Sequence, residues 1–447
     1  MIAPLSEGAN AAAAPGGPSG AGLDGRAYLR LVLLGAAIGV PAALVAALFL
    51  ALVHDLEHWL WHDLPDALGH SSAPWYLVVG LPVAGAAIVV AARLLLPGDG
   101  GHSPIEGLSM APTPPSHAPG VALAALGTLP FGAVLGPEAP VIALGSVVGV
   151  AAARFSPAGE RETRVLASAG GFAAISALFG GPLVAGMLLV EGGIGMGAML
   201  LPVLLPGLVA AGIGYLVFVG FGDWGGLEAP GLVVSDLPLY DGVHLLDLVV
   251  AVVIGVVGAL IVLVARRAGE RVHGLDGTLG LPALLLGGGL AVGLLAELGG
   301  QLGADPMDIL FSGQASLNAV TSSSTKIVLV LLVAKLLAYA VSLGCGFRGG
   351  PVFPAIFLGV ALASLTVVVF DVSPTLAIAV GAAAGTAAQT RLLITPVLLA
   401  AVLVGTQGSD AVPAAVLASA AAWLTMAAVE GVELGPETPV HERGAHP

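Results

Sequence analysis

Two related stretches of this 447-residue sequence decide its fold: Gly136-Pro137-Glu138-Ala139-Pro140-Val141-Ile142-Ala143-Leu144-Gly145 and Gly350-Pro351-Val352-Phe353-Pro354-Ala355-Ile356-Phe357-Leu358-Gly359. Six of their ten positions are identical, and the two stretches lie 214 residues apart. The same offset pairs Pro182 with Pro396 and Gly171 with Gly385. One offset that holds this far indicates an internal duplication. We therefore expect two homologous halves, 28–225 and 240–432, in the inverted arrangement typical of transporters with interrupted helices.

The composition places these halves in a membrane. Hydrophobic residues make up 57% of the sequence and charged residues only 9%, whereas soluble domains carry about 25% charged residues. The 66 glycines and 32 prolines are tolerated in membrane helices, because neighbouring helices satisfy the freed backbone groups. The composition excludes a water-soluble globular protein and predicts an all-α polytopic membrane protein.

Charge and cysteine content exclude further classes. The formal net charge of −14 has the wrong sign for binding nucleic acid or an anionic lipid surface. The single cysteine, Cys345, excludes an intramolecular disulfide and a thiolate metal cage. We expect no nucleic-acid partner, no cofactor and no metal.

Apolar runs define the expected membrane segments. Those at 29–53 and 75–97 are long enough to cross a bilayer, which takes about 20 residues. From residue 101 the runs are shorter and separated by Gly and Pro, so we expect broken or tilted helices buried in protein. We expect a disordered tail at 1–27, a short tail at 433–447 and no cytosolic regulatory domain. The later apolar runs are 119–134, 140–153, 165–179, 182–190, 198–221, 248–265, 279–298, 328–344, 354–370, 375–388, 392–405 and 411–430.

Both copies of the repeat carry Gly-Pro-x-x-Pro ahead of an apolar run. Proline suits the first turn of a helix, and glycine lets the backbone approach a ligand. Each copy therefore predicts a helix that begins inside the membrane, with its free N–H groups and positive dipole end directed into the protein. Two such ends form an anion site without a buried cation. The residues predicted to form it are Gly136, Pro137, Ala139, Pro140, Gly350, Val352, Phe353 and Pro354, with Gly101, His102, Ser103 and Pro104 from a third loop.

The two copies differ at a position that controls the chemistry, because Glu138 in the first corresponds to Val352 in the second. Acids inside membrane segments are costly and mark functional sites. When ionised, Glu138 would occupy the anion site itself, and when protonated it would release the site. The alternative is a plain carboxylate that satisfies N–H groups at a helix start. Capping one helix does not require a Gly-Pro pair in each half of the chain, so we interpret Glu138 as a gate.

In order and spacing, GHSPIEG at 101–107, GPEAP at 136–140 and GPVFP at 350–354 resemble three motifs of the CLC family of chloride channels and proton–chloride exchangers. The resemblance implies a homodimer in a bacterial inner membrane, with one anion pathway per subunit gated by Glu138. Its partners would be chloride or a related small anion, membrane lipid and, in an exchanger, protons.

The sequence departs from the family's motifs at several positions. Pro137 and Ala139 replace the residues that flank the family's glutamate, and the anion-binding serine corresponds to Ser103 or is replaced by His102. The phenylalanine of the third motif falls on Val352, with Phe353 beside it. Chloride preference is therefore implied by the family and not by these residues.

A channel is our first interpretation and a proton-coupled antiporter on the same fold is the alternative. The exchangers use a second acid, whose position falls on Gly192 here, and Glu191 precedes it by one residue. One residue is about 100° around a helix, so Glu191 is either a proton-path residue or an acid at a helix end. A cation-coupled symporter would need clustered intramembrane Asp, Asn and Ser, which the sequence lacks near its breaks.

An enzyme is not expected, because the sequence offers only one pairing of a nucleophile with a base. Ser103 lies beside His102, and adjacent side chains point apart on most backbones.

Three other polar features have two interpretations each. His54, His58 and His62 share a helix face and suit either a metal site or, as we prefer, an interfacial helix end with Trp59 and Trp61. Snorkelling explains Lys326 and Lys335 more simply than a role in the pathway. Arg348 either raises the local positive potential or anchors a loop.

Overall fold

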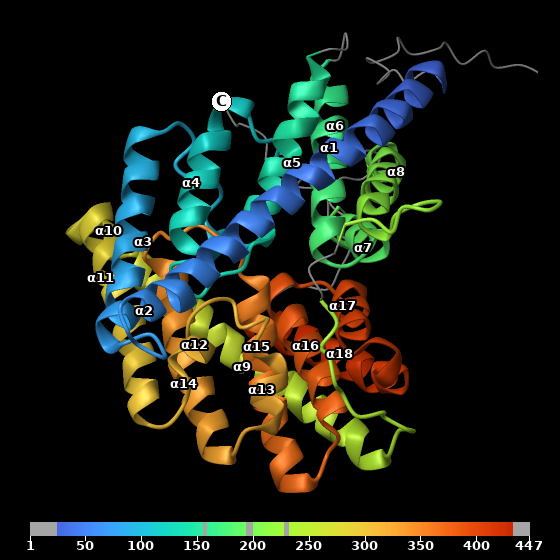
Figure 1. Cartoon of the computed structure of the whole chain (residues 1–447). Coiled ribbons are helices and arrows are strands. Elements are labelled where there is room, and N and C mark those ends of the chain that lie inside the picture. The colour runs from blue at the N-terminus through green and yellow to red at the C-terminus, as the bar shows by residue number, and fades with distance from the viewer. Residues whose placement is uncertain (1–24, 155–158, 194–199, 228–231, 432–447) are drawn as a thin grey trace, which may run out of the picture.

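The computed structural model describes residues 25–154, 159–193, 200–227 and 232–431, and these residues form a helical membrane protein (Figure 1). Eight of its helical segments are long and apolar enough to cross a membrane, and two shorter apolar helices accompany them. The predicted tails lie outside the described residues, except that the first helix already begins at Gly25.

Among the described residues, the first half of the chain has eight α-helices. Figure 1 shows α1 running across the front of the molecule, with α4, α5 and α6 on one side of it. The helices are α1 (Gly25–His58), α2 (Leu64–Ala67), α3 (Trp75–Leu95), α4 (Ala118–Thr128), α5 (Glu138–Ala153), α6 (Glu160–Leu178), α7 (Pro182–Gly192) and α8 (Leu200–Val219).

Most of the second half lies on the other side of α1, where α12 to α18 lie together, whereas α10 and α11 lie beside α3 (Figure 1). Its helices are α9 (Leu245–His273), α10 (Asp276–Leu279), α11 (Leu281–Gln301), α12 (Pro306–Ile309), α13 (Leu317–Ser322), α14 (Thr325–Gly344), α15 (Val352–Phe370), α16 (Pro374–Thr390), α17 (Ile394–Val404) and α18 (Val412–Glu430).

The predicted helical organisation is confirmed, since each apolar run coincides with a helix within a few residues at most ends. The clearest difference is at 129–134, which is apolar but follows the end of α4 and forms the loop that leads to Glu138. The sequence analysis also missed α12 and α13, because both are short and lie among polar residues.

Glycines let the central helices pack closely in both halves. A Cβ atom at Gly145 of α5 would overlap the Gly170 carbonyl of α6, and one at Gly359 of α15 would overlap the Gly381 carbonyl of α16. Gly145 and Gly359 occupy the same position in the repeat. Close backbone approach through small residues is typical of membrane helices, which cannot rely on the hydrophobic effect to associate.

The interpretation of Trp61 as an interfacial residue was wrong. Its side chain is 2% exposed, whereas that of Trp59 is 52% exposed. The indole N–H of Trp61 donates to the Pro130 carbonyl (2.8 Å), and its ring meets Phe311 edge-on with centroids 5.4 Å apart. A π-helical turn at Trp59–Asp63 joins α1 to α2. Trp61 therefore fixes the 129–134 loop instead of facing the membrane surface.

Snorkelling was also the wrong explanation for Lys335, which is fully buried on α14. Its ammonium group donates to the carbonyls of Asp308 (2.8 Å) and Leu310 (2.9 Å) and lies 4.3 Å from the centre of the Phe357 ring. The C-terminal end of α12 supplies these carbonyls, so the amine needs no route to the membrane surface. Lys326, at the start of α14, is exposed.

Candidate anion site

The two copies of the repeat meet at their glycines. Gly136 N–H donates to the Gly350 carbonyl (2.7 Å) and Gly350 N–H donates to the Gly136 carbonyl (2.6 Å). This antiparallel pair ties together two loops that are 214 residues apart in the chain. It thereby brings the N-termini of α5 and α15 to one point, as the sequence predicted.

Glu138 is the first residue of α5 and is fully buried. Its Oε1 accepts hydrogen bonds from the backbone N–H groups of Val352 and Phe353, both at 2.9 Å. The acid of the first half thus caps the first turn of α15 in the second half, where the helix dipole favours negative charge. The carboxylate occupies the place that the sequence analysis assigned to an anion.

The second oxygen of this carboxylate, Oε2, has no hydrogen-bond partner among the described residues. Hydrogen bonds to an ionised group contribute about 1.5–3 kcal/mol each, while burying an ion costs several kcal/mol. Two bonds to Oε1 and none to Oε2 bring these opposing effects close in size.

The Glu138 carboxylate fits only because the two residues beside it, at positions 136 and 350, are glycines. A Cβ atom at Gly136 or at Gly350 would overlap Glu138 Oε2. Neither glycine has a positive φ, so close approach, and not backbone conformation, is the requirement here.

The flanking prolines occupy positions that a helix start tolerates. Pro137 and Pro351 precede α5 and α15, and Pro140 and Pro354 lie in their first turns. Their missing N–H groups leave no intrahelical hydrogen bond unmade. Ala139 follows Glu138 in the first turn and is half-buried.

Tyr339 holds the Gly350-Pro351 loop before α15 in place. It is fully buried on α14, and its hydroxyl donates to the Pro351 carbonyl (2.9 Å) and lies 3.1 Å from Gln389 Oε1. One turn further, Ser342 Oγ accepts the Val134 N–H (3.0 Å) from the loop before α5. The sequence analysis missed these residues, although polar side chains within the apolar runs of α14 and α16 were a usable signal.

The family of this chain follows from its similarity to known proteins. Residues 102–426 match the family model described as voltage gated chloride channel. The chain belongs to the CLC family.

Relatives and solved structures agree with this assignment. YfeO of Escherichia coli strain SE11 and of Shigella boydii serotype 4, both named as candidate ion-transport proteins, are 32% identical over 346 residues, which is 75% of this chain and 79% of theirs. A slow cyanobacterial Cl⁻/H⁺ antiporter has a similar fold, with a TM-score of 0.73 at 18% identity, covering 90% of this chain and 95% of the antiporter. A CLC-type fluoride/proton antiporter gives 0.68 at 21% identity, covering 90% and 96%. This CLC protein is therefore an integral membrane protein of an anion-transport family.

The third loop, at 101–107, does not begin an α-helix. Pro104–Glu106 forms only a 3₁₀ turn, and the Ser103 side chain makes no cap hydrogen bond. Gly107 then adopts a φ of 88°, and no described hydrogen bond links the loop to Glu138. Glycine and the proline-rich residues that follow end this turn. The expected role of Gly101, His102, Ser103 and Pro104 in the anion site of this CLC protein stays a prediction.

His102 stands beside Ser103 in this loop. Its Nδ1 lies 3.6 Å from Glu106 Oε2, while its Nε2 is buried without a partner among the described residues. Burial lowers the pKa of His102, helped by the charge of Arg348 and opposed by Glu106. The neutral imidazole is therefore favoured.

Arg348 anchors the same loop. Its guanidinium donates to the Asp99 carboxylate and, at 3.0 Å, to the Asp99 carbonyl. Arg93 donates to both oxygens of that carboxylate at 2.8 and 2.9 Å and to the Gly346 carbonyl at 3.0 Å. Arg348 is thus paired with an acid, which fits the loop-anchor interpretation.

Asp99→Asn is expected to lower the stability of this CLC protein by about 1–3 kcal/mol, between the values for exposed and buried ion pairs. Burial alone would raise the pKa of Asp99, but the hydrogen bonds and charges of Arg93 and Arg348 outweigh it and lower the pKa. A depressed folded-state pKa means that the stabilisation is present above the unfolded pKa of about 3.9 and is lost as the pH falls below it. Thermal unfolding of both proteins across this range should show the difference vanish in acid. An equal difference at every pH would contradict the ion-pair explanation, and Asp223→Asn, at an exposed acid, is the control.

Glu191, at the end of α7, caps α17. Its carboxylate accepts hydrogen bonds from the N–H groups of Leu393 (2.9 Å), Ile394 (2.8 Å) and Thr395 (2.6 Å), and from the Thr395 hydroxyl (2.6 Å). Four donors stabilise the ionised form. This geometry favours the helix-end interpretation over a role in passing protons.

Glu191→Gln is therefore expected to reduce stability and to lower anion and proton transport by the same factor. The amide places an NH₂ group against backbone donors, and an unsatisfied buried group costs about 1–3 kcal/mol. Thermal unfolding and paired flux measurements check this result, with Glu270→Gln, at an exposed acid on α9, as control. Selective loss of proton movement would instead assign Glu191 to the proton path.

Proposed function

We propose that this CLC protein is a proton-coupled antiporter of a small monovalent anion, with Glu138 as the group that binds the proton. The observation that supports this most directly is the buried Glu138 carboxylate, held by the N–H groups of Val352 and Phe353. An anion and an ionised carboxylate compete for the same donors, so only one of them binds at a time.

The exchange follows from this competition. Ionised Glu138 closes the site by occupying the N-terminus of α15. When a proton binds to the carboxylate, its negative charge is lost and its bonds to Val352 and Phe353 weaken. The neutral side chain leaves, and an anion takes the two N–H groups and the dipole end. Release of the anion to one side and of the proton to the other restores the closed state.

Antiport is now preferred to the channel interpretation of the sequence analysis. Two structures with similar folds are named as Cl⁻/H⁺ and fluoride/proton antiporters. The site also supports antiport, because Glu138 occupies the N–H groups of Val352 and Phe353 and an anion can bind them only when the carboxylate moves. A small halide is the proposed substrate. The homodimer, the surrounding lipid and the bacterial inner membrane are part of the same proposal.

The test uses the purified protein in liposomes, with an anion gradient imposed and with internal pH and anion concentration recorded together. Movement of protons against their gradient, driven by chloride or fluoride, is the expected result. Anion flux without linked proton movement would overturn antiport in favour of a channel. Running chloride and fluoride in parallel identifies the halide.

A further inference from the structure

A cavity of about 630 Å³ lies beside the loop that leads to Glu138. Its lining includes Leu135 and Pro137, the latter being the residue directly before Glu138. Phe311 and Gly313 from the loop after α12 also line it. The titratable residues in its lining are His54, Glu57, His62, Asp305 and Asp308.

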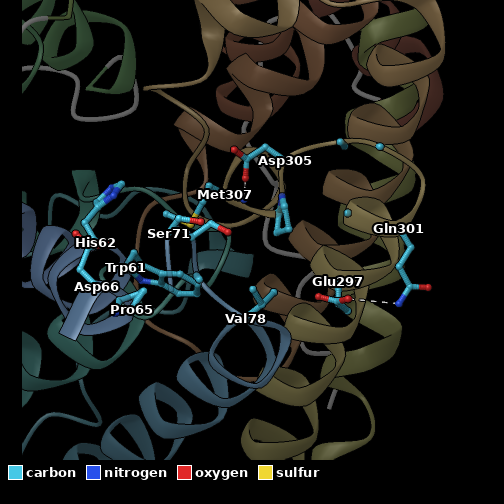
Figure 2. Close-up of a pocket in the computed structure, with 16 residues that line it drawn as sticks. Trp61, His62, Pro65, Asp66, Ser71, Val78, Glu297, Gln301, Asp305 and Met307 are labelled. Atoms are coloured by element: carbon cyan, nitrogen blue, oxygen red, sulfur yellow. Dashed lines mark hydrogen bonds between the residues drawn. The ribbon is translucent and has the colours of Figure 1, made fainter. Parts of the chain in front are cut away.

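A second cavity, of about 790 Å³, adjoins the first and shares His62, Asp305 and Met307 with it. Figure 2 shows this second cavity, with His62 and Asp66 on one side and Glu297 on the other. In the described part of the chain, neither cavity is lined by lysine or arginine. The titratable residues of the combined lining are therefore acids and histidines only.

This lining has the wrong sign for attracting an anion, since carboxylates repel it. The nearest buried cation, Lys335, directs its ammonium group to the carbonyls of Asp308 and Leu310. Acids and imidazoles do, however, bind and release protons. A function in proton supply explains a lining that anion attraction does not.

The titratable groups differ in burial along this region. His54, His62 and Asp305 are exposed, Glu57 and Asp308 are half-buried, and Glu138 is fully buried with an unpartnered Oε2. Burial also raises the pKa of Asp308, so this residue holds a proton more readily than an exposed aspartate. The order from exposed to buried is the order in which a proton from solvent would meet these groups.

The helix that carries the histidines is locally modified. His62 lies in the π-helical turn Trp59–Asp63, and such turns are frequent at functional sites. His54 and His62 both line the first cavity. His58, between them, is absent from both linings and instead has its Nδ1 3.4 Å from Asp63 Oδ1. His58 therefore offers a matched control on the same helix.

We propose that this cavity is a proton-collecting vestibule for Glu138, an inference that rests on the proposed antiport. A proton from solvent binds first to His54, His62 or Asp305. It then passes through cavity water to Glu57 or Asp308, and finally to the free Oε2 of Glu138. At each transfer one N–H or O–H bond breaks and another forms, with no change in oxidation state. The volume holds about twenty waters at the liquid value of about 30 Å³ each.

The experiment compares the wild type with the double variant His54→Gln/His62→Gln in liposomes at low buffer concentration. We expect coupled transport to fall at least about tenfold, a smaller factor than the roughly 10²–10⁴ that a positioned proton-transfer group contributes to catalysis. Added imidazole buffer should restore the rate, because a mobile buffer carries protons past the missing side chains. His58→Gln is expected to behave as the wild type. Asp305→Asn, an exposed single change, repeats the test should the double variant not fold.

The same substitutions in a Glu138→Gln background separate proton supply from anion conduction. There we expect anion flux to be unaffected by the loss of His54 and His62. An equal loss of flux in that background, or a loss that imidazole does not restore, would overturn the vestibule. Coupled transport at the wild-type rate in the double variant would overturn the vestibule alone. A wild type that moves no protons would overturn the proposed antiport together with it.

Discussion

Glu138→Gln is expected to abolish coupled proton movement and to make anion flux nearly independent of pH. The amide cannot bind a proton and carries no charge, so it resembles the protonated carboxyl group permanently. Its two bonds to the N–H groups of Val352 and Phe353 become neutral ones, about half as strong as those of the carboxylate. Proton flux should fall to the level of protein-free liposomes while anion flux persists, as measured by simultaneous pH and anion recording.

Glu160→Gln is the matched control for this result. Glu160 opens α6 and its side chain is 94% exposed, so its charge is far from any buried helix start. We expect wild-type coupling and pH dependence in this variant. Steep pH dependence retained in Glu138→Gln would contradict the assignment of Glu138 as the gate.

Gly136→Ala is expected to force the gate open. The added Cβ would overlap the Glu138 carboxylate and would meet no other residue first, so the carboxylate must leave the N–H groups of α15. The two bonds that it loses contribute about 1.5–3 kcal/mol each. Since 1.4 kcal/mol corresponds to a factor of ten, anion flux at alkaline pH should rise at least about tenfold. Flux measured from neutral to alkaline pH checks this prediction.

A double-mutant cycle isolates the contact between the two residues. In a Glu138→Ala background the carboxylate is gone, and Gly136→Ala should then change the flux no further. Gly212→Ala on α8, where a Cβ would meet nothing within 4 Å, controls for the substitution itself. An equal increase with and without the Glu138 side chain would show that the methyl group acts on the loop and not on the gate.

The membrane fold was predictable because its signal is local. A helix that crosses a bilayer must satisfy its own backbone hydrogen bonds and present an apolar surface, so each long apolar run marks one. The starts of α5 and α15 were also predictable, because glycine and proline constrain the backbone within a few residues. The repeat pairs these two starts, and Glu138 belongs to the first of them, so its place where the two starts meet followed from the sequence pattern.

Predictions from the neighbouring sequence were wrong where a side chain binds a group that lies far away along the chain. Lys335 and Trp61 have sequences around them that suit a membrane surface, yet both side chains are buried. Trp61 donates to the Pro130 carbonyl, and Lys335 donates to two carbonyls at the end of α12. The third loop comes at the expected place in the order of motifs, but it forms only a short turn. Just before this turn, Asp99 is held by Arg348, which lies 249 residues away in the chain.

The sequence alone identifies a duplicated helical membrane protein with a lone acid at one of two buried helix starts. The folded chain adds that this acid caps the helix of the opposite half, that Tyr339 donates to the loop before α15, and that Glu191 caps α17. Propensity and hydrophobicity act over a few residues, whereas a hydrogen bond needs two groups within about 3 Å. Which distant groups come that close depends on how the two halves pack together, and no short stretch of sequence contains that information.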